Sequence, residues 1–124
     1  EISLGLVGSE MCIRDSIKTN KKVTAEQAHC IKSHLDLAIA AIPGKTADWL
    51  MVEVEENCNL FFRNSNDPAA MVEVSLYGKA SENALSVFTS NITGILLDVL
   101  SISTDRTYVS YALTEHWGWN GSNF

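Results

Sequence analysis

Apolar residues recur at helical spacing in two segments of the chain. The first segment follows Thr24 and the glutamine three residues later, which together form a capping box, and it ends before Pro43. The second follows Ser81, a favourable helix N-cap residue. These patterns predict helices over Thr24–Ile42 and Ser81–Leu100. Their apolar faces are formed by Ala28, Ile31, Leu35, Ala38 and Ile42, and by Leu85, Phe88, Ile92, Ile95 and Val99.

The two helical patterns superpose when 57 is added to the residue numbers of the first. Apolar positions 28, 31, 35, 38 and 42 become 85, 88, 92, 95 and 99, so every apolar residue coincides with another. The same shift carries Asp48 onto Asp105 and Ile17 onto Val74. Such self-similarity indicates an internal repeat, and we expect the two halves of the chain to share one structure.

Alternating apolar and polar residues flank each predicted helix, as is typical of strands. Four strands are expected, at Ile17–Asn20, Trp49–Glu55, Met71–Tyr77 and Thr107–Leu113. Each half then has the order strand, helix, strand, and right-handed crossovers between parallel strands place both helices on one side. The predicted fold class is α+β, with two βαβ repeats forming a four-stranded mixed sheet and two helices on one face.

The other face of this predicted sheet is mixed in character. Its strand positions carry Met51, Glu53, Glu55, Glu73, Ser75, Tyr108 and Ser110. This set is too polar for the core of a sandwich and too varied for an ordinary solvent-facing surface. We therefore expect it to line a wet interior between subunits. The segment 56–70 joins the halves and, being rich in Asn, Asp, Ser and Pro, is expected to be a loop.

Length and charge limit the functional classes. The 124 residues suit a single domain. Nine Lys and Arg residues against fifteen Asp and Glu residues give a net charge of -6, so there is no basic field for phosphate backbones or anionic lipids. Nucleic acid is therefore not an expected partner. Continuous apolar stretches fall short of the roughly twenty residues of a membrane span, so no membrane insertion is expected.

The cysteines and histidines indicate neither disulfides nor a metal site. The three cysteines are Cys12, Cys30 and Cys58, an odd number without a Cys-x-x-Cys pair, which favours free thiols in a reducing compartment. His29 and His34 are five residues apart and His116 stands alone, so no metal ligand set is predicted. No cofactor is expected.

The first sixteen residues fall outside the repeat. Their apolar part, Ile2–Val7, is short and has no basic region before it, unlike a secretory signal. The segment also resembles read-through from a sequencing adapter. We therefore treat 1–16 as an N-terminal extension and 17–124 as a single domain.

The chain ends in a motif that neither a helix nor a strand requires: Trp117-Gly118-Trp119-Asn120-Gly121-Ser122-Asn123-Phe124. This ending resembles the carboxy-terminal Gly-Trp-Asn-x-Ser-x-Phe of the macrophage migration inhibitory factor family, part of the tautomerase superfamily. Further matches follow in order: Thr19-Asn20, Pro43-Gly44-Lys45, Asp67-Pro68-Ala69-Ala70, Gly78-Lys79, and Asp105-Arg106 with Tyr108. Each motif is weak alone, but their order and spacing are specific, and they cover about residues 17–124.

The resemblance implies a homotrimer with active sites between neighbouring subunits. It also implies keto–enol tautomerisation of small aromatic 2-keto acids such as phenylpyruvate, or of a dopachrome ester, with an amino-terminal proline as the base. A free terminal amine has a reference pKa of about 7.7–8.0, which an apolar site lowers further, so it can accept a proton at neutral pH.

This chain departs from the family at its first strand. The position of the proline is occupied by Ile13, whose internal amide cannot act as a base. Arg14 and Asp15 replace residues that are normally apolar in the family. We therefore expect the chain as given to have weak tautomerase activity or none.

The remaining pocket residues match in part. The resemblance implies that Lys45 binds the substrate carboxylate and that Tyr108 enters the pocket from a neighbouring subunit. Ser110 replaces an asparagine of the best-known members, and Tyr77 replaces an aliphatic wall residue. An aromatic rim, or alternatively a seal at a subunit contact, is expected from Trp117, Trp119 and Phe124.

Three functions remain open. In the first, the native protein is a tautomerase and the sequence upstream of Ile17 has replaced its true start. In the second, the trimer is a catalytically inactive cytokine-like or small-carboxylate-binding protein, with a cell-surface receptor by family analogy; a variant starts at Met11 and exposes the amine of Cys12. The third, hydration or dehalogenation of an unsaturated acid, fits the tail less well.

The resemblance also implies a localisation. Family members are typically cytoplasmic, and some are secreted by unconventional routes. We therefore expect this protein to be cytoplasmic, with secretion by such a route as the alternative.

Overall fold

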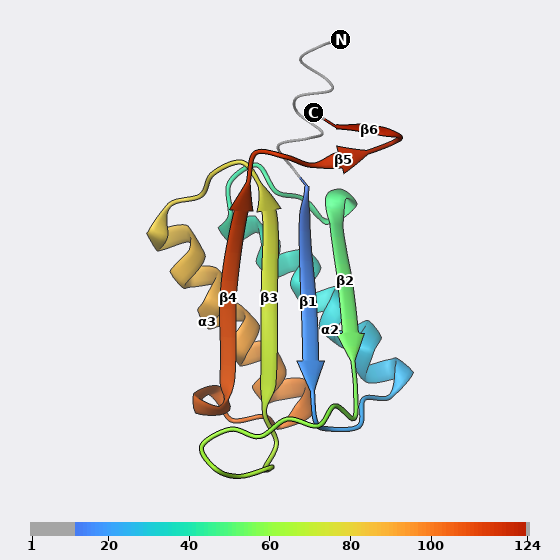
Figure 1. Cartoon of the computed structure of the whole chain (residues 1–124), viewed down its shortest axis with the longest axis vertical. Helices are drawn as coiled ribbons and strands as arrows, with labels where there is room; N and C mark the ends of the chain where they lie inside the picture. The colour runs from blue at the N-terminus through green and yellow to red at the C-terminus, as the bar shows by residue number, and fades with distance from the viewer. Residues whose placement is uncertain (1–11, 124) are drawn as a thin grey trace.

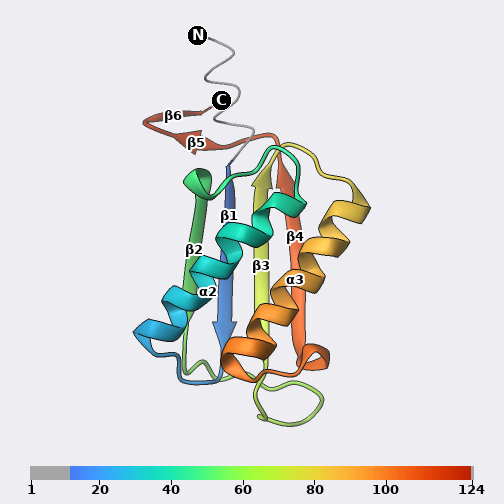
Figure 2. The same ribbon diagram turned by 180° about the vertical axis from the view of Figure 1, so that it is seen from behind.

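Four strands form one mixed sheet in the computed structural model, which describes residues 12–123. They are β1 (Ile13–Thr19), β2 (Leu50–Glu55), β3 (Ala70–Tyr77) and β4 (Thr107–Thr114), in the spatial order β2-β1-β3-β4. The central pair β1 and β3 is antiparallel, and each outer strand is parallel to its neighbour (Figure 1). Helices α2 (Ala25–Ala38) and α3 (Glu82–Leu100) cover the same face of the sheet (Figure 2). The predicted fold class is confirmed.

The internal repeat is present in the structure. Adding 57 to the bounds of β1 gives 70–76, which lies within β3, and the buried helix positions 31, 35 and 39 become the buried positions 88, 92 and 96. Ala38 was predicted to lie on the apolar face of the first helix, but it is only half-buried. The reason is that α2 ends at Ala38 and a 3₁₀ turn, Ile39–Ala41, follows it. That turn directs Ile39 into the core.

Side chains accept hydrogen bonds from main-chain N–H groups in the first turn of each helix, as the sequence predicted. The hydroxyl of Thr24 accepts from the main-chain nitrogen of Gln27 at 3.1 Å, and the side chain of Gln27 accepts from the main-chain nitrogen of Thr24 at 3.0 Å. This reciprocal pair is a capping box. Ser81 accepts from the main-chain nitrogen of Ala84 at 3.1 Å and caps α3.

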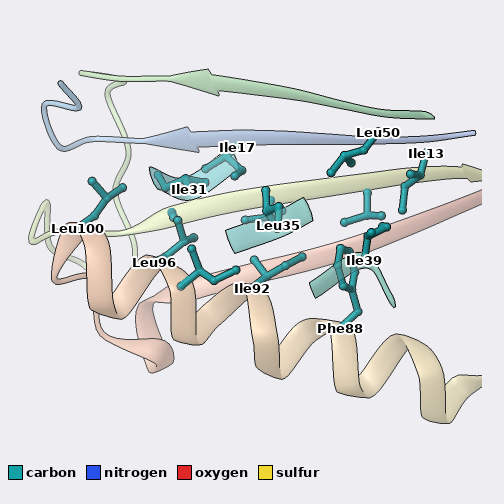
Figure 3. Packing of buried hydrophobic residues seen from close by; sticks show 14 of the residues in the cluster. Ile13, Ile17, Ile31, Leu35, Ile39, Leu50, Phe88, Ile92, Leu96 and Leu100 are labelled. Atoms are coloured by element: carbon teal, nitrogen blue, oxygen red, sulfur yellow. The ribbon is translucent and has the colours of Figure 1, made fainter. Parts of the chain in front are cut away.

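The hydrophobic core lies between the sheet and the two helices. Figure 3 shows Ile13, Ile17 and Leu50 from the strands facing the apolar sides of the helices. Among residues 12–123, α3 is the one helix long and apolar enough to cross a membrane, by length and composition alone. In this fold its side chains Phe88 and Leu96 are fully buried in the core.

The first strand begins earlier than predicted. β1 starts at Ile13, four residues before the predicted start at Ile17, so residues 13–16 belong to the sheet. The sequence pattern missed them because Arg14 and Asp15 interrupt the expected apolar alternation. In the structure Arg14 is exposed and Asp15 is fully buried.

The chain ends in a short hairpin that the sequence analysis did not predict. Its strands are β5 (Gly118–Trp119) and β6 (Ser122–Asn123). Asn120 and Gly121 form the turn with φ of 54° and 87°, the left-handed backbone of a type I′ hairpin turn. The hairpin lies beyond the end of the sheet at which β1 begins (Figure 1).

Candidate functional site

A cavity of about 610 Å³ lies where β1 begins and the C-terminal hairpin follows the sheet. The start of β1, the start of β2, the 3₁₀ turn Ala47–Trp49 and the hairpin form its walls. The rings of Trp49 and Trp119 contact each other edge to face, with 4.8 Å between centroids and 74° between planes. Such geometry is favourable for aromatic pairs, so this contact links the hairpin to the beginning of β2.

The predicted aromatic rim is partly described by the structure. Trp117 and Trp119 both line the cavity, and Trp119 is 50% exposed. Phe124 lies outside the described residues. Trp49 was not predicted as a site residue, although a tryptophan four residues after Lys45 and at the start of a predicted strand was an available signal. It also missed the polar lining residues Asp48 and His116.

Lys45 is 6% exposed and does not itself line this cavity, but its charge acts on Cys12, a residue of the cavity wall. It follows Gly44, whose φ of 85° favours glycine, and its main-chain nitrogen donates to the carbonyl of Ile42 at 3.1 Å. This turn directs the side chain toward β3, where Nζ donates to the carbonyl of Tyr77 at 2.7 Å. The predicted residues Lys45 and Tyr77 therefore lie together at the end of β3.

Cys12 completes this cluster and is part of the cavity wall. The main-chain nitrogen of Tyr77 donates to the carbonyl of Cys12 at 3.1 Å. Burial raises the pKa of the Cys12 thiol, and the positive charge of Lys45 offsets part of that rise. Lys45 thus adds a positive charge directly behind the wall of the cavity.

Ile13, which the sequence resemblance predicts to stand where the family has its proline, lines the cavity with 1% of its surface exposed. Next to it, Arg14 also lines the cavity and donates through Nη2 to the hydroxyl of Ser75 at 3.2 Å. The predicted base position is therefore part of the cavity wall, and it holds an apolar side chain at the start of β1.

Asp15 faces the helices, inside the core. The residue is 0% exposed, and neither carboxyl oxygen has a hydrogen-bond partner among the described residues. Burial raises its pKa from 3.8 to about 7, because the charged form loses its hydration. A polar group buried without partners is strongly unfavourable, so Asp15 is a misfit in this strand.

Tyr108 and Ser110 lie toward the opposite end of the sheet from Lys45. Tyr108 pairs with Met71 near the start of β3, whereas Lys45 binds the carbonyl of Tyr77 at its end. Met71 and Tyr77 are six positions apart along the strand, a distance of about 20 Å. One chain therefore cannot bring Tyr108 to the cavity beside its own Lys45.

Sequence and structure comparisons identify the family. A profile of the family "Macrophage migration inhibitory factor (MIF)" matches residues 11–124. The chain belongs to the MIF family. It is 33% identical to the macrophage migration inhibitory factor of Mus musculus over 94 residues, which are 74% of this chain and 82% of that protein. For the Xenopus laevis protein the identity is 29% over the same coverage.

Solved structures of MIF proteins share this fold. Leishmania major MIF2 has a TM-score of 0.86 and 24% identity, covering 91% of this chain and 97% of that one. The Toxoplasma gondii macrophage migration inhibitory factor has a TM-score of 0.83 and 19% identity, covering 90% of this chain and 99% of that one. The MIF family match begins at residue 11 and so includes β1 from its first residue, Ile13.

Proposed function

We propose that this chain carries the ligand pocket of a MIF-type keto–enol tautomerase, formed between copies in a homotrimer. One observation carries the proposal: Lys45 lies next to Cys12 in the wall of an aromatic-lined cavity, whereas Tyr108 lies about 20 Å away along the same sheet. A second copy must supply Tyr108 if both residues are to contact one ligand. In a cyclic trimer such a heterologous contact closes after three copies.

The uncovered face of the sheet supports assembly through this surface. Met51 is 67% exposed and Tyr108 is 65% exposed, and both lie on the face opposite the helices. Glu53 and Ser110 are exposed beside them. Large apolar side chains interspersed with polar groups suit a hydrated interior between subunits better than open solvent.

The chemistry of the cavity suits a small aromatic 2-keto acid. The tryptophan rings supply flat apolar walls for an aromatic ring, and Lys45 supplies the charge that attracts a carboxylate. Enolisation also needs a base that removes a proton beside the carbonyl. Ile13 cannot serve as that base, so we infer that the chain as given enolises phenylpyruvate weakly or not at all.

The unpartnered burial of Asp15 supports the hypothesis that the sequence upstream of about Ile17 is not the native one. An apolar residue at this position would complete the core between Ile13 and Ile17, whereas the carboxyl group is buried without a partner. Under this proposal the native first strand begins with proline and continues with apolar side chains.

An enolisation assay tests the proposal. The full chain is compared with a version that starts with proline in place of Ile13, directly before Arg14. We expect phenylpyruvate turnover only in the proline version, and its loss when Lys45→Met is added. Turnover by the full chain equal to that of the proline version, or none in either, would contradict the assignment.

The second candidate function is ligand binding without turnover. It is favoured by the cavity itself, which remains about 610 Å³ with its aromatic walls although Ile13 fills the proline position. Titration of the full chain with phenylpyruvate should then detect binding while enolisation stays at background. Binding without turnover in the proline version as well would favour this candidate over the tautomerase.

A further inference from the structure

The ring of Phe62 packs against the ring of Tyr108 on the uncovered face of the sheet. The centroids are 4.8 Å apart and the ring planes are inclined by 67°, which is an edge-to-face contact. Tyr108 is nevertheless 65% exposed, so most of its surface remains available to another molecule. Phe62 belongs to the loop between β2 and β3, at the end of the sheet opposite the C-terminal hairpin (Figure 1).

A tight turn fixes Phe62 within that loop. Its main-chain nitrogen donates to the carbonyl of Ser65 at 2.9 Å, and the main-chain nitrogen of Ser65 donates to the carbonyl of Phe62 at 3.1 Å. Arg63 and Asn64 between them have φ of 54° and 62°. Asparagine tolerates left-handed backbone, but the conformation is unfavourable for Arg63, so the surrounding contacts must help to hold this turn in place.

Arg106 supplies much of that support. Its guanidinium group donates to four main-chain carbonyls of the loop, those of Phe62, Ser65, Asp67 and Pro68, at 2.9–3.3 Å. The same group lies over the Phe62 ring, 5.4 Å from its centroid. Arg106 is two residues before Tyr108 in the chain, so it ties the loop to the beginning of β4.

We propose that Phe62 is a positioning residue, which holds the Tyr108 ring in the orientation in which it enters the ligand site of a neighbouring copy. This inference rests on the proposed function. An exposed tyrosine loses rotational freedom when it binds a ligand, and a ring contact made beforehand reduces that loss. The strained turn and the four bonds of Arg106 explain how a loop residue keeps a fixed ring position.

Phenylpyruvate titration of the full chain and its variants tests the inference. Phe62→Leu should weaken binding about three- to tenfold, the range expected for one edge-to-face contact. Phe62→Tyr keeps an aromatic ring and should bind like the unsubstituted chain. Phe61→Leu is the matched control, because Phe61 is adjacent and 76% exposed, and it should leave the affinity unchanged.

A double variant separates positioning from a general loss of structure. In a chain that already carries Tyr108→Leu, the further change Phe62→Leu should not weaken binding again, because its effect acts through Tyr108. Unchanged affinity in Phe62→Leu, or an equal loss with and without Tyr108, would overturn the inference while the proposed function stands. If the unsubstituted chain does not bind phenylpyruvate, the proposed function fails first and the inference with it.

Discussion

Nζ of Lys45 donates a 2.7 Å hydrogen bond to the carbonyl of Tyr77, the last residue of β3. This bond joins the loop after α2 to the end of a central strand, beside the cavity. Lys45 is only 6% exposed, so its ammonium group is shielded from solvent. A charge in such surroundings acts more strongly on a ligand than it does in water.

Removing this charge should weaken ligand binding. We expect Lys45→Met to raise the Kd for phenylpyruvate about tenfold or more, because a hydrogen bond to a charged group contributes about 1.5–3 kcal/mol. Calorimetric titration measures the change. Lys79→Met removes an exposed lysine two residues beyond Tyr77 and is the control. Equal affinities for both variants and the unsubstituted chain would exclude Lys45 from binding.

Asp15 should make folding stability depend on pH. Its pKa is 3.8 in the reference state and about 7 in the fold, so the folded state binds the proton more tightly. Its contribution is therefore fully present below about pH 4 and is lost as the pH rises through about 7, a change of about 4 kcal/mol. Asp15→Val should remove this dependence.

Urea unfolding at pH 4 and at pH 8 measures that effect. The gap in unfolding free energy between the chain and Asp15→Val should widen at pH 8, with the variant more stable. Glu73→Val is a suitable control, because Glu73 is exposed on the adjacent strand. A gap that is the same at both pH values would show that Asp15 does not titrate inside the core.

Arg106 should stabilise the loop between β2 and β3. Lysine keeps the positive charge, but its single ammonium group cannot donate to all four carbonyls that the guanidinium group reaches. Arg106→Lys should therefore lower the unfolding free energy by about 2 kcal/mol. Amide hydrogen exchange at Phe62 and Ser65 should become faster. Arg63→Lys is the comparison, because within residues 12–123 the Arg63 side chain makes a single 3.8 Å ion pair, to exposed Asp105. Similar effects of the two changes would contradict this role.

The capping box of α2 should contribute measurably to stability. Thr24→Ala removes the acceptor for the main-chain nitrogen of Gln27 and should cost about 1 kcal/mol. Thermal unfolding gives the value. Ser33→Ala, at an exposed position inside the same helix, should change stability by less, because it removes no cap.

The fold was largely predictable because its two halves repeat one pattern. Helical spacing and the capping residues located α2 and α3, and alternation located β2, β3 and β4 to within one residue at each end. The start of β1 was not predictable from pattern, since Arg14 and Asp15 have the polarity of a loop. The family profile, which begins at residue 11, includes this part of the strand.

The candidate site was predictable only where a motif carried it. The tail motif pointed to Trp117 and Trp119, and both line the cavity. Trp49 was missed because its contact with Trp119 joins segments far apart in sequence. The separation of Tyr108 from Lys45 also depends on strand register, which local periodicity does not reveal. The expected localisation and receptor stay predictions.

A mixing experiment tests most directly whether the site is shared between copies. Chains carrying Lys45→Met and chains carrying Tyr108→Leu are unfolded together, refolded as a mixture and titrated with phenylpyruvate. Each variant alone should bind weakly, whereas the mixture should regain about one quarter of the full-affinity sites, those with an intact Lys45 and an intact Tyr108 from neighbouring copies. A mixture that binds no better than either variant alone would contradict a shared site.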